Sequence, residues 1–231
     1  MDRDTAVRKY LTLIKQCMLF RELPEKQLFD ALQLLRAEYR TYRKGMFLHH
    51  AGEPLRKFGF VLSGAVQAMT DDPDGNRMIM ANVIPGGTFG ESLCYLKIKD
   101  SPAFIRASEN AEILWLSLAE LYGEPAPQEA LARDLRRRFT AMLAERALTM
   151  NQRIQVLSNI TIRDKLTTFF THAANRAGSR SFTISMTRED LAAYIGANRS
   201  AMIRELSKMR DEGLIEFSRN RFRIIKFEKN T

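Results

Sequence analysis

The pattern of apolar and polar positions divides the chain into three zones, and the clearest boundary encloses a segment from Tyr42 to about Leu118. Apolar runs of strand length alternate there with turn residues at regular intervals, namely Gly52, Gly64, Asp74-Gly75 and Pro85-Gly86-Gly87. This spacing predicts an all-β roll or barrel. The Asp-Gly pair between two such runs predicts the tip of a hairpin.

Helical sequence flanks this roll, amphipathic in residues 5–37 and more sustained from Gln128 to about Leu157. In the second helix, five apolar residues recur at steps of 4, 3, 4 and 3, namely Leu143, Ala147, Met150, Ile154 and Leu157. This seam predicts contact with another helix, most simply the same helix in a homodimer. The alternative is packing on the chain's own roll, but a second stripe is available for that contact, formed by Leu131, Leu135, Phe139 and Met142.

The third zone begins near residue 159 and holds the most specific pattern in the chain. Thr187 followed three residues later by Asp190 is a capping box, in its Asp-for-Glu form, that opens a short helix. Gly196 then makes a turn, and Asn198 is suited to cap a second helix. Two short helices joined in this way predict a helix-turn-helix.

The second of these helices has two distinct faces when its residues are projected at the helical period. One face is apolar and is expected to be buried, formed by Met202, Leu206 and Met209, and Gly213 is expected to end the helix. The other face points outward with cations at its N-terminal end, formed by Arg199, Ser200, Ile203, Arg204 and Ser207. After this helix, LIEFSRNRFRIIKF alternates apolar and polar residues around Asn220, which predicts a two-stranded wing.

The charge balance supports a nucleic-acid partner. The formal net charge is +9, and Lys and Arg outnumber Asp and Glu by 14 to 8 between residues 159 and 231. A solvated structural module is the plainer interpretation, because glycine-linked helix pairs occur in many proteins that bind no DNA. The cap, the turn, the basic outward face and the wing nevertheless agree with one another, which favours DNA binding.

Other classes of function find little support. No apolar run approaches the roughly 20 residues that span a bilayer, and residues 1–20 mix acids and bases, so we expect a cytoplasmic protein without membrane contact. Cys17 and Cys94 are too few for a four-cysteine zinc or iron–sulfur site. None of the three histidines stands in a catalytic pattern, and we expect no enzymatic activity.

Four stretches carry a family resemblance, namely YRKGMFLHHAGEP, FVLSGAVQ, DGNRMIMANVIPGGTFGE and TREDLAAYIGANRSAMIRELSKMRDEGLI. Together with the order of the zones, they make nearly the whole chain resemble the Crp/Fnr superfamily of bacterial transcription regulators. The resemblance implies an α+β fold with a double-stranded β-helix or jelly-roll sensor domain of the cyclic-nucleotide-binding type (1–127), a dimerisation helix (128–158) and a winged helix-turn-helix (159–231). It also implies a homodimer that binds a two-fold double-stranded DNA operator, works with RNA polymerase and senses a signal, such as a small-molecule effector.

The resemblance and the positions of side chains on the two helices together predict which side chains contact DNA, namely Thr187, Arg188, Arg199, Ser200, Ile203 and Arg204. Arg199 and Arg204 match family positions that contact phosphate or guanine. Ser200 replaces the family's usual glutamate, so the preferred half-site is expected to be altered. Ile203 is expected to pack on a thymine methyl, and Thr187 and Arg188 are expected to hold phosphates.

By the same resemblance, the effector pocket is formed by Gly90, Glu91, Cys94, Ser101, Met150 and Asn151. In family members that bind cyclic nucleotides, an arginine and a serine or threonine after the Gly-Glu turn hold the cyclic phosphate. Ser101 and Pro102 stand at those two positions here, and Arg106 belongs to the next strand. Proline also removes a backbone donor, and the charge-assisted pair with phosphate is missing. Met150 and Asn151 stand where small hydroxyl residues are usual, so cyclic AMP is not expected to be the effector.

The nature of the signal stays open among several alternatives. Cys94 suggests redox sensing or haem ligation, against an ordinary buried thiol. His49, His50 and Glu53 suggest a metal site, but adjacent residues on a strand point to opposite faces, which favours a solvated strand end. An uncharged or carboxylate ligand in a Met-lined pocket and the absence of any ligand are the remaining alternatives, and no cofactor is predicted. A competing hypothesis is a sensory module whose helix-turn-helix is only structural.

Overall fold

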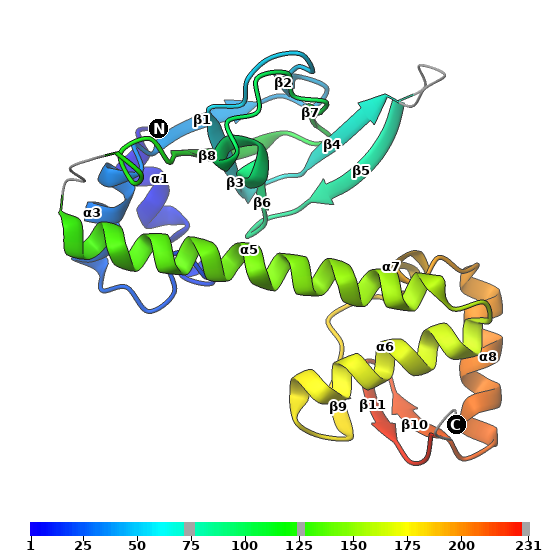
Figure 1. Ribbon diagram of the computed structural model, residues 1–231. Coiled ribbons are helices and arrows are strands. Elements are labelled where there is room, and N and C mark those ends of the chain that lie inside the picture. Colours follow the sequence, from blue (N-terminus) through cyan, green and yellow to red (C-terminus); the bar gives the residue numbers. More distant parts are fainter. Residues whose placement is uncertain (72–76, 124–127, 228–231) are drawn as a thin grey trace. The chain divides into compact units, whose positions relative to one another are not determined.

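The chain divides into two units, Met1–Leu143 and Ala144–Thr231. The computed structural model describes residues 1–71, 77–123 and 128–227 (Figure 1). The expected hairpin tip at Asp74-Gly75 lies outside the described residues. The boundary between the units falls inside a long helix, α5 (Glu129–Ser158), so this helix contributes to both units.

The first unit contains the predicted β-roll, built from two four-stranded antiparallel sheets. One sheet has the order β1 (Glu38–Tyr42), β8 (Ala111–Ser117), β3 (Lys57–Ser63) and β6 (Thr88–Phe89). The other has the order β2 (Phe47–His49), β7 (Phe104–Ala107), β4 (Val66–Asp71) and β5 (Arg77–Val83). The expectation of a jelly-roll-like domain is therefore confirmed.

Strands β3 and β8 serve two cores at once, because successive side chains of a strand point to opposite faces. Phe58 pairs with Leu116 and Phe60 with Leu114, and all four are fully buried in a core shared with the N-terminal helices. The intervening side chains lie in a second core between the two sheets, formed in part by Val61, Ile113 and Trp115. Each fully buried side chain of this size contributes about 1.5–3 kcal/mol to folding.

Short helices cover the outer core of the roll. They are α1 (Arg3–Lys9), α2 (Leu11–Ile14), α3 (Glu25–Leu34) and α4 (Glu91–Tyr95). The first part of α5 joins them through Leu135 and Phe139, which are fully buried, as the second apolar stripe predicted. Leu143, which the sequence places in the dimer seam, is half-buried and packs partly against this core. The reason is that Leu143 lies four residues after Phe139 and so shares its face of the helix.

The second unit is a winged helix-turn-helix around its own core. It contains α6 (Ile162–Ala177), α7 (Arg188–Tyr194), α8 (Arg199–Asp211), β9 (Ser181–Thr183), β10 (Ile215–Ser218) and β11 (Arg221–Ile224). The predicted wing hairpin is present as β10 and β11, and β9 adds a third strand that the sequence interpretation missed. Phe182 of β9 stacks on Phe222 of β11 at an interplanar angle of 14°. Helix α6 covers this sheet (Figure 1), with Phe170 4.7 Å from Phe222 between ring centroids.

Candidate DNA-binding surface and effector site

The helix-turn-helix is fixed by local hydrogen bonds that the sequence predicts. At the start of α7, Thr187 Oγ1 accepts from the backbone N–H of Asp190 (3.1 Å), and Asp190 Oδ2 accepts from the N–H of Thr187 (3.2 Å). Gly196 makes the turn in the left-handed region at φ 61°. A Cβ at this glycine would lie 3.1 Å from Leu157 Cδ2, so both backbone and packing favour glycine there.

Helix α8 presents a buried face and an exposed face, as expected for a recognition helix. Asn198 Oδ1 caps it by accepting from the N–H groups of Ser200 (2.9 Å) and Ala201 (3.3 Å). The predicted apolar face is at most 1% exposed, formed by Met202, Leu206 and Met209. Beyond the helix, Gly213 adopts φ 70°, as its predicted terminating role requires.

The predicted DNA-contacting side chains differ in how freely they reach solvent. Ser200 and Arg204 are exposed on α8, whereas Ile203 is half-buried and packs partly against the core of the unit. Arg199 is also exposed, and its Nε donates to Glu189 Oε1 at 2.6 Å. Exposed ion pairs contribute about 0–1 kcal/mol to stability. Arg199 can therefore leave Glu189 for a DNA phosphate or base with little loss of free energy.

Arg188 joins the start of α7 to the wing. Its Nη2 donates to the carbonyl oxygen of Arg219 at 2.6 Å, and its guanidinium carbon lies 4.8 Å from the ring centroid of Phe222 and 5.5 Å from that of Phe217. The side chain is half-buried, and this burial lowers its pKa. The structure thus places Arg188, assigned to phosphate from the sequence, in a contact that holds the wing.

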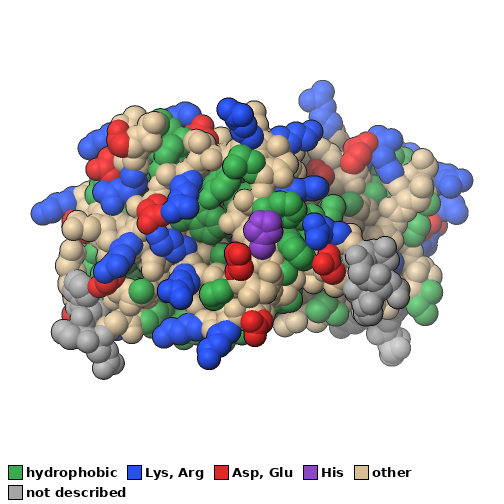
Figure 2. Space-filling view, turned by 90° about the horizontal axis from the view of Figure 1, so that it is seen from above, with side chains coloured by type: hydrophobic (Ala, Val, Ile, Leu, Met, Phe, Trp, Pro, Cys, Tyr) green, Lys and Arg blue, Asp and Glu red, His purple; other side chains and the backbone are tan. Residues whose placement is uncertain are grey.

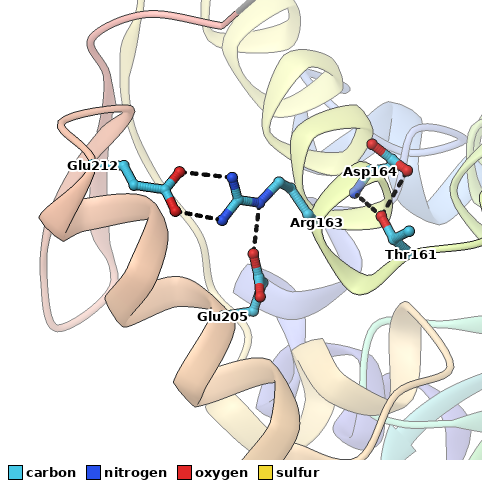
Figure 3. Close-up of polar contacts among 5 residues, drawn as sticks. All are labelled: Thr161, Arg163, Asp164, Glu205 and Glu212. Carbon is cyan, nitrogen blue, oxygen red and sulfur yellow. Dashed lines mark hydrogen bonds and ion pairs between the residues drawn. The ribbon is translucent and has the colours of Figure 1, made fainter.

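A second arginine ties α6 to the recognition helix (Figure 3). Arg163 Nε donates to Glu205 Oε1 at 2.6 Å, and its two Nη atoms donate to the carboxylate of Glu212 at 2.6 and 2.8 Å. These hydrogen bonds lower the pKa of Glu212. Sequence reasoning missed this contact, although Glu205 and Glu212 are seven residues apart and therefore lie close to one line along the helix.

The remaining seam of α5 is apolar and exposed. Met150 and Ile154 are 59% and 60% exposed, Leu157 is 40% exposed, and Ala147 is exposed as well. Leu148 adds a further exposed apolar side chain to this helix. Val156 points the other way and is fully buried in the core of the second unit. Large apolar side chains clustered in solvent are typical of an interaction surface.

Of the residues expected to form the effector pocket, those in the first unit take part in the local structure of the roll. Gly90 precedes α4 in the left-handed region (φ 80°), and Glu91 is 3% exposed and accepts a hydrogen bond from Thr88. Ser101 is 2% exposed, and its Oγ accepts from the N–H of Ala103 at 3.2 Å. Met150 and Asn151 are exposed on α5 in the second unit.

The structure gives Arg106 no route to replace a phosphate-binding arginine inside the roll. Its neighbours Ile105 and Ala107 are buried between the two sheets, so the alternation of β7 directs Arg106 to the outer face. There Nη2 donates to Gln67 Oε1 at 3.3 Å.

Cys94 and His49 are the two candidate redox or metal residues, and both are buried. Cys94 Sγ donates to the carbonyl oxygen of Arg56 at 3.2 Å, and burial raises the pKa of its thiol. His49 is 6% exposed, which corrects the expectation of a solvated strand end, since the roll covers the end of β2. Burial lowers the pKa of His49. Over the described ranges, no group of three or more His, Cys, Asp and Glu side chains is arranged to hold a metal ion.

The surface carries more positive than negative charge, in line with the formal net charge of +9. On the face drawn in Figure 2, Lys and Arg side chains are spread over the surface, with fewer Asp and Glu between them. In the described part of the chain, no helix has an apolar stretch that would cross a bilayer.

Comparisons with known proteins agree with this architecture. Residues 39–123 match the cyclic nucleotide-binding domain, and residues 164–229 match the Crp-like helix-turn-helix domain. A roll of the first type joined to a helix-turn-helix of the second defines a DNA-binding transcription regulator with a cyclic-nucleotide-binding-like domain. The chain belongs to the Crp/Fnr superfamily, which confirms the resemblance found in its sequence.

Individual relatives are distant. Electron transport regulator A of Shewanella oneidensis is 26% identical, with 81% of this chain and 74% of the relative aligned. The cAMP-activated global transcriptional regulator CRP of Pasteurella multocida is 23% identical, with 73% and 80% aligned. Among solved structures, CprK complexed with OCPA has a similar fold at a TM-score of 0.56 and 16% identity, covering 87% of this chain and 90% of that one.

Proposed function

We propose that this regulator acts as a homodimer that binds a two-fold symmetric DNA operator through α8, under the control of a signal other than cyclic AMP. The observation that carries the proposal is the outward face of α8. There Arg199, Ser200 and Arg204 are exposed, while the opposite face is fully buried. In helix-turn-helix proteins, the second helix lies in the major groove and its N-terminal residues contact base edges.

The exposed seam of α5 supports the homodimer. Met150 and Ile154 expose more than half of their surface, although both are large and apolar. Burying such side chains against the same side chains of a second copy gives a self-complementary interface with two-fold symmetry. A two-fold dimer presents two recognition helices, so the operator should contain two inverted half-sites about one helical turn (~34 Å) apart.

The loop after α4 supports a signal other than cyclic AMP. Recognition of a cyclic phosphate depends on charge-assisted hydrogen bonds from a guanidinium. Ser101 and Pro102 supply none, and Arg106 lies on the outer face of the roll. The buried thiol of Cys94, with its raised pKa, argues against a thiolate-based redox signal. An uncharged or carboxylate ligand therefore remains the favoured kind of effector.

Selection from a random DNA library with the purified full chain tests the proposal. We expect enrichment of an inverted repeat and an affinity that falls steeply with salt, because bound phosphates displace counterions. Sedimentation of the same preparation should give a dimer at micromolar concentration. Enrichment of a single half-site bound by a monomer would overturn the homodimer, and no enrichment at all would favour the purely structural helix-turn-helix.

A further inference from the structure

A hollow of about 370 Å³ lies within the second unit, between the end of α5, α6, the segment that follows β9, and α7. Small-molecule sites commonly occupy about 300–1,000 Å³ and combine an apolar body with a few polar groups. The apolar part of this hollow is largely aromatic, formed by Phe169, Phe182 and Tyr194 together with Ile184 and Met186. Its size and composition therefore suit a compact ring-containing molecule.

The polar part of the hollow carries positive charge without a carboxylate. Arg176, His172 and Gln152 contribute to its wall, and the described lining contains no Asp or Glu. Arg176 Nη2 donates to Gln152 Oε1 at 2.8 Å, a neutral partner that leaves further guanidinium N–H donors available. Burial and the nearby Arg176 lower the pKa of His172, which leaves a neutral imidazole able to donate one hydrogen bond at neutral pH.

We propose that this hollow binds a small molecule with an apolar ring system and a single anionic group. The ring lies among Phe169, Phe182 and Tyr194, and the anion pairs with the Arg176 guanidinium, which can bind a carboxylate with two parallel hydrogen bonds. An uncharged molecule of the same shape gains the aromatic contacts but not the pair with Arg176. The site therefore prefers the anion.

The position of the hollow connects ligand binding to α7, the first helix of the helix-turn-helix. Thr149 and Gln152 belong to α5, while Tyr194 is the last residue of α7. The Tyr194 ring already contacts Phe169 at 5.4 Å between centroids, and the Arg153 guanidinium carbon lies 5.6 Å from its centre. A ligand in the hollow contacts α5, α6 and α7, and therefore fixes the position of α7 relative to α5. The expected change in DNA affinity is about 5-fold or more, and only this effect rests on the proposed function.

Calorimetry of the full chain with 2-naphthoate and its uncharged analogue 2-naphthamide tests the site. We expect one naphthoate per chain, and a smaller affinity for the amide. Arg176→Gln should weaken naphthoate binding about 10-fold or more and leave the amide unchanged. Arg180→Gln is the matched control, because Arg180 is exposed nearby but does not line the hollow.

Variants that fill the hollow distinguish binding in the hollow from binding of the aromatic probes to the exposed apolar seam of α5. Ala173→Trp should abolish binding of both probes, and Ala177→Trp at the exposed end of α6 serves the same purpose if the first variant does not fold. Binding that survives the folded filling variant, equal binding of both probes, or no binding at millimolar concentration overturns the proposal. A wild-type chain that binds naphthoate but selects no DNA sequence contradicts the proposed function alone.

Discussion

The guanidinium carbon of Arg188 lies 4.8 Å from the ring centroid of Phe222, and this contact links the first residue of α7 to the middle of the wing. The same guanidinium donates to the carbonyl oxygen of Arg219, in the turn between β10 and β11. A side chain whose position in the sequence predicts contact with DNA phosphate therefore also holds the wing. The two roles have different experimental signatures.

Replacement of Arg188 distinguishes these roles. Arg188→Ala should lower the free energy of unfolding by about 2 kcal/mol, since it removes a cation–π contact and a charged hydrogen bond. If its main role is to hold the wing, the slope of log affinity against log salt should not change, whereas loss of a phosphate contact would lower it by about 0.9. Arg188→Lys keeps the charge but loses the planar stacking, so it should recover only part of the stability. A reduced slope with unchanged stability would restore the simple phosphate role.

The dimer seam makes a prediction about Ile154, which is 60% exposed on α5. In a two-fold dimer, Ile154→Glu places two carboxylates in the apolar interface, where unpaired charge is strongly unfavourable. We expect monomers at micromolar concentration and a large loss of affinity for the full operator. Gln155→Glu, an exposed neighbour that is off the seam, is the matched control and should remain dimeric. An Ile154→Glu variant that still sediments as a dimer would show that the chains associate elsewhere.

The ion-pair network of Arg163 predicts a pH-dependent stability. Its hydrogen bonds hold the pKa of Glu212 below the ordinary value of 4.5, so the stabilisation is present above that pH and is lost as the pH falls through the lowered pKa. Arg163→Gln should therefore be less stable than wild type at pH 7, and the difference should shrink as the pH falls below about 4.5.

Urea unfolding of the wild-type protein and of Arg163→Gln at several pH values measures this difference in the free energy of unfolding. Lys165→Gln, a change of the same charge on the same helix, should show no such convergence if the effect belongs to Arg163. A difference between wild type and Arg163→Gln that stays constant down to the acid limit would remove Glu212 as its source.

The parts of this fold that the sequence predicts are those built from near neighbours. The Thr187–Asp190 box, the Asn198 cap and the Gly196 turn each depend on residues within three positions of one another, and all are present. The alternation of apolar residues likewise predicts the roll and the buried face of α8. Local patterns fix these elements because hydrogen-bonded caps and amphipathic faces need no distant partner.

The missed features depend on residues that meet only in three dimensions. Arg163 and Glu212 are separated by 49 positions, and β9 has three residues that become a strand only by pairing with β11. The burial of His49 and the partial burial of Ile203 depend in the same way on what packs over them. The periodicity of one segment does not show which distant segments will pack over it.

The last prediction concerns the role of Arg204 in the recognition of DNA bases. This side chain is exposed on the outward face of α8. An arginine that donates to both O6 and N7 of guanine contributes about 1–3 kcal/mol of discrimination. We expect Arg204→Ala to lose the preference for guanine at one position of each half-site, with weaker loss of affinity for random DNA. Lys208→Ala, one helical turn further along, is the control and should weaken binding to all sequences about equally. Library selection repeated with both variants measures the outcome, and an unchanged sequence preference for Arg204→Ala would remove α8 as the base-reading helix.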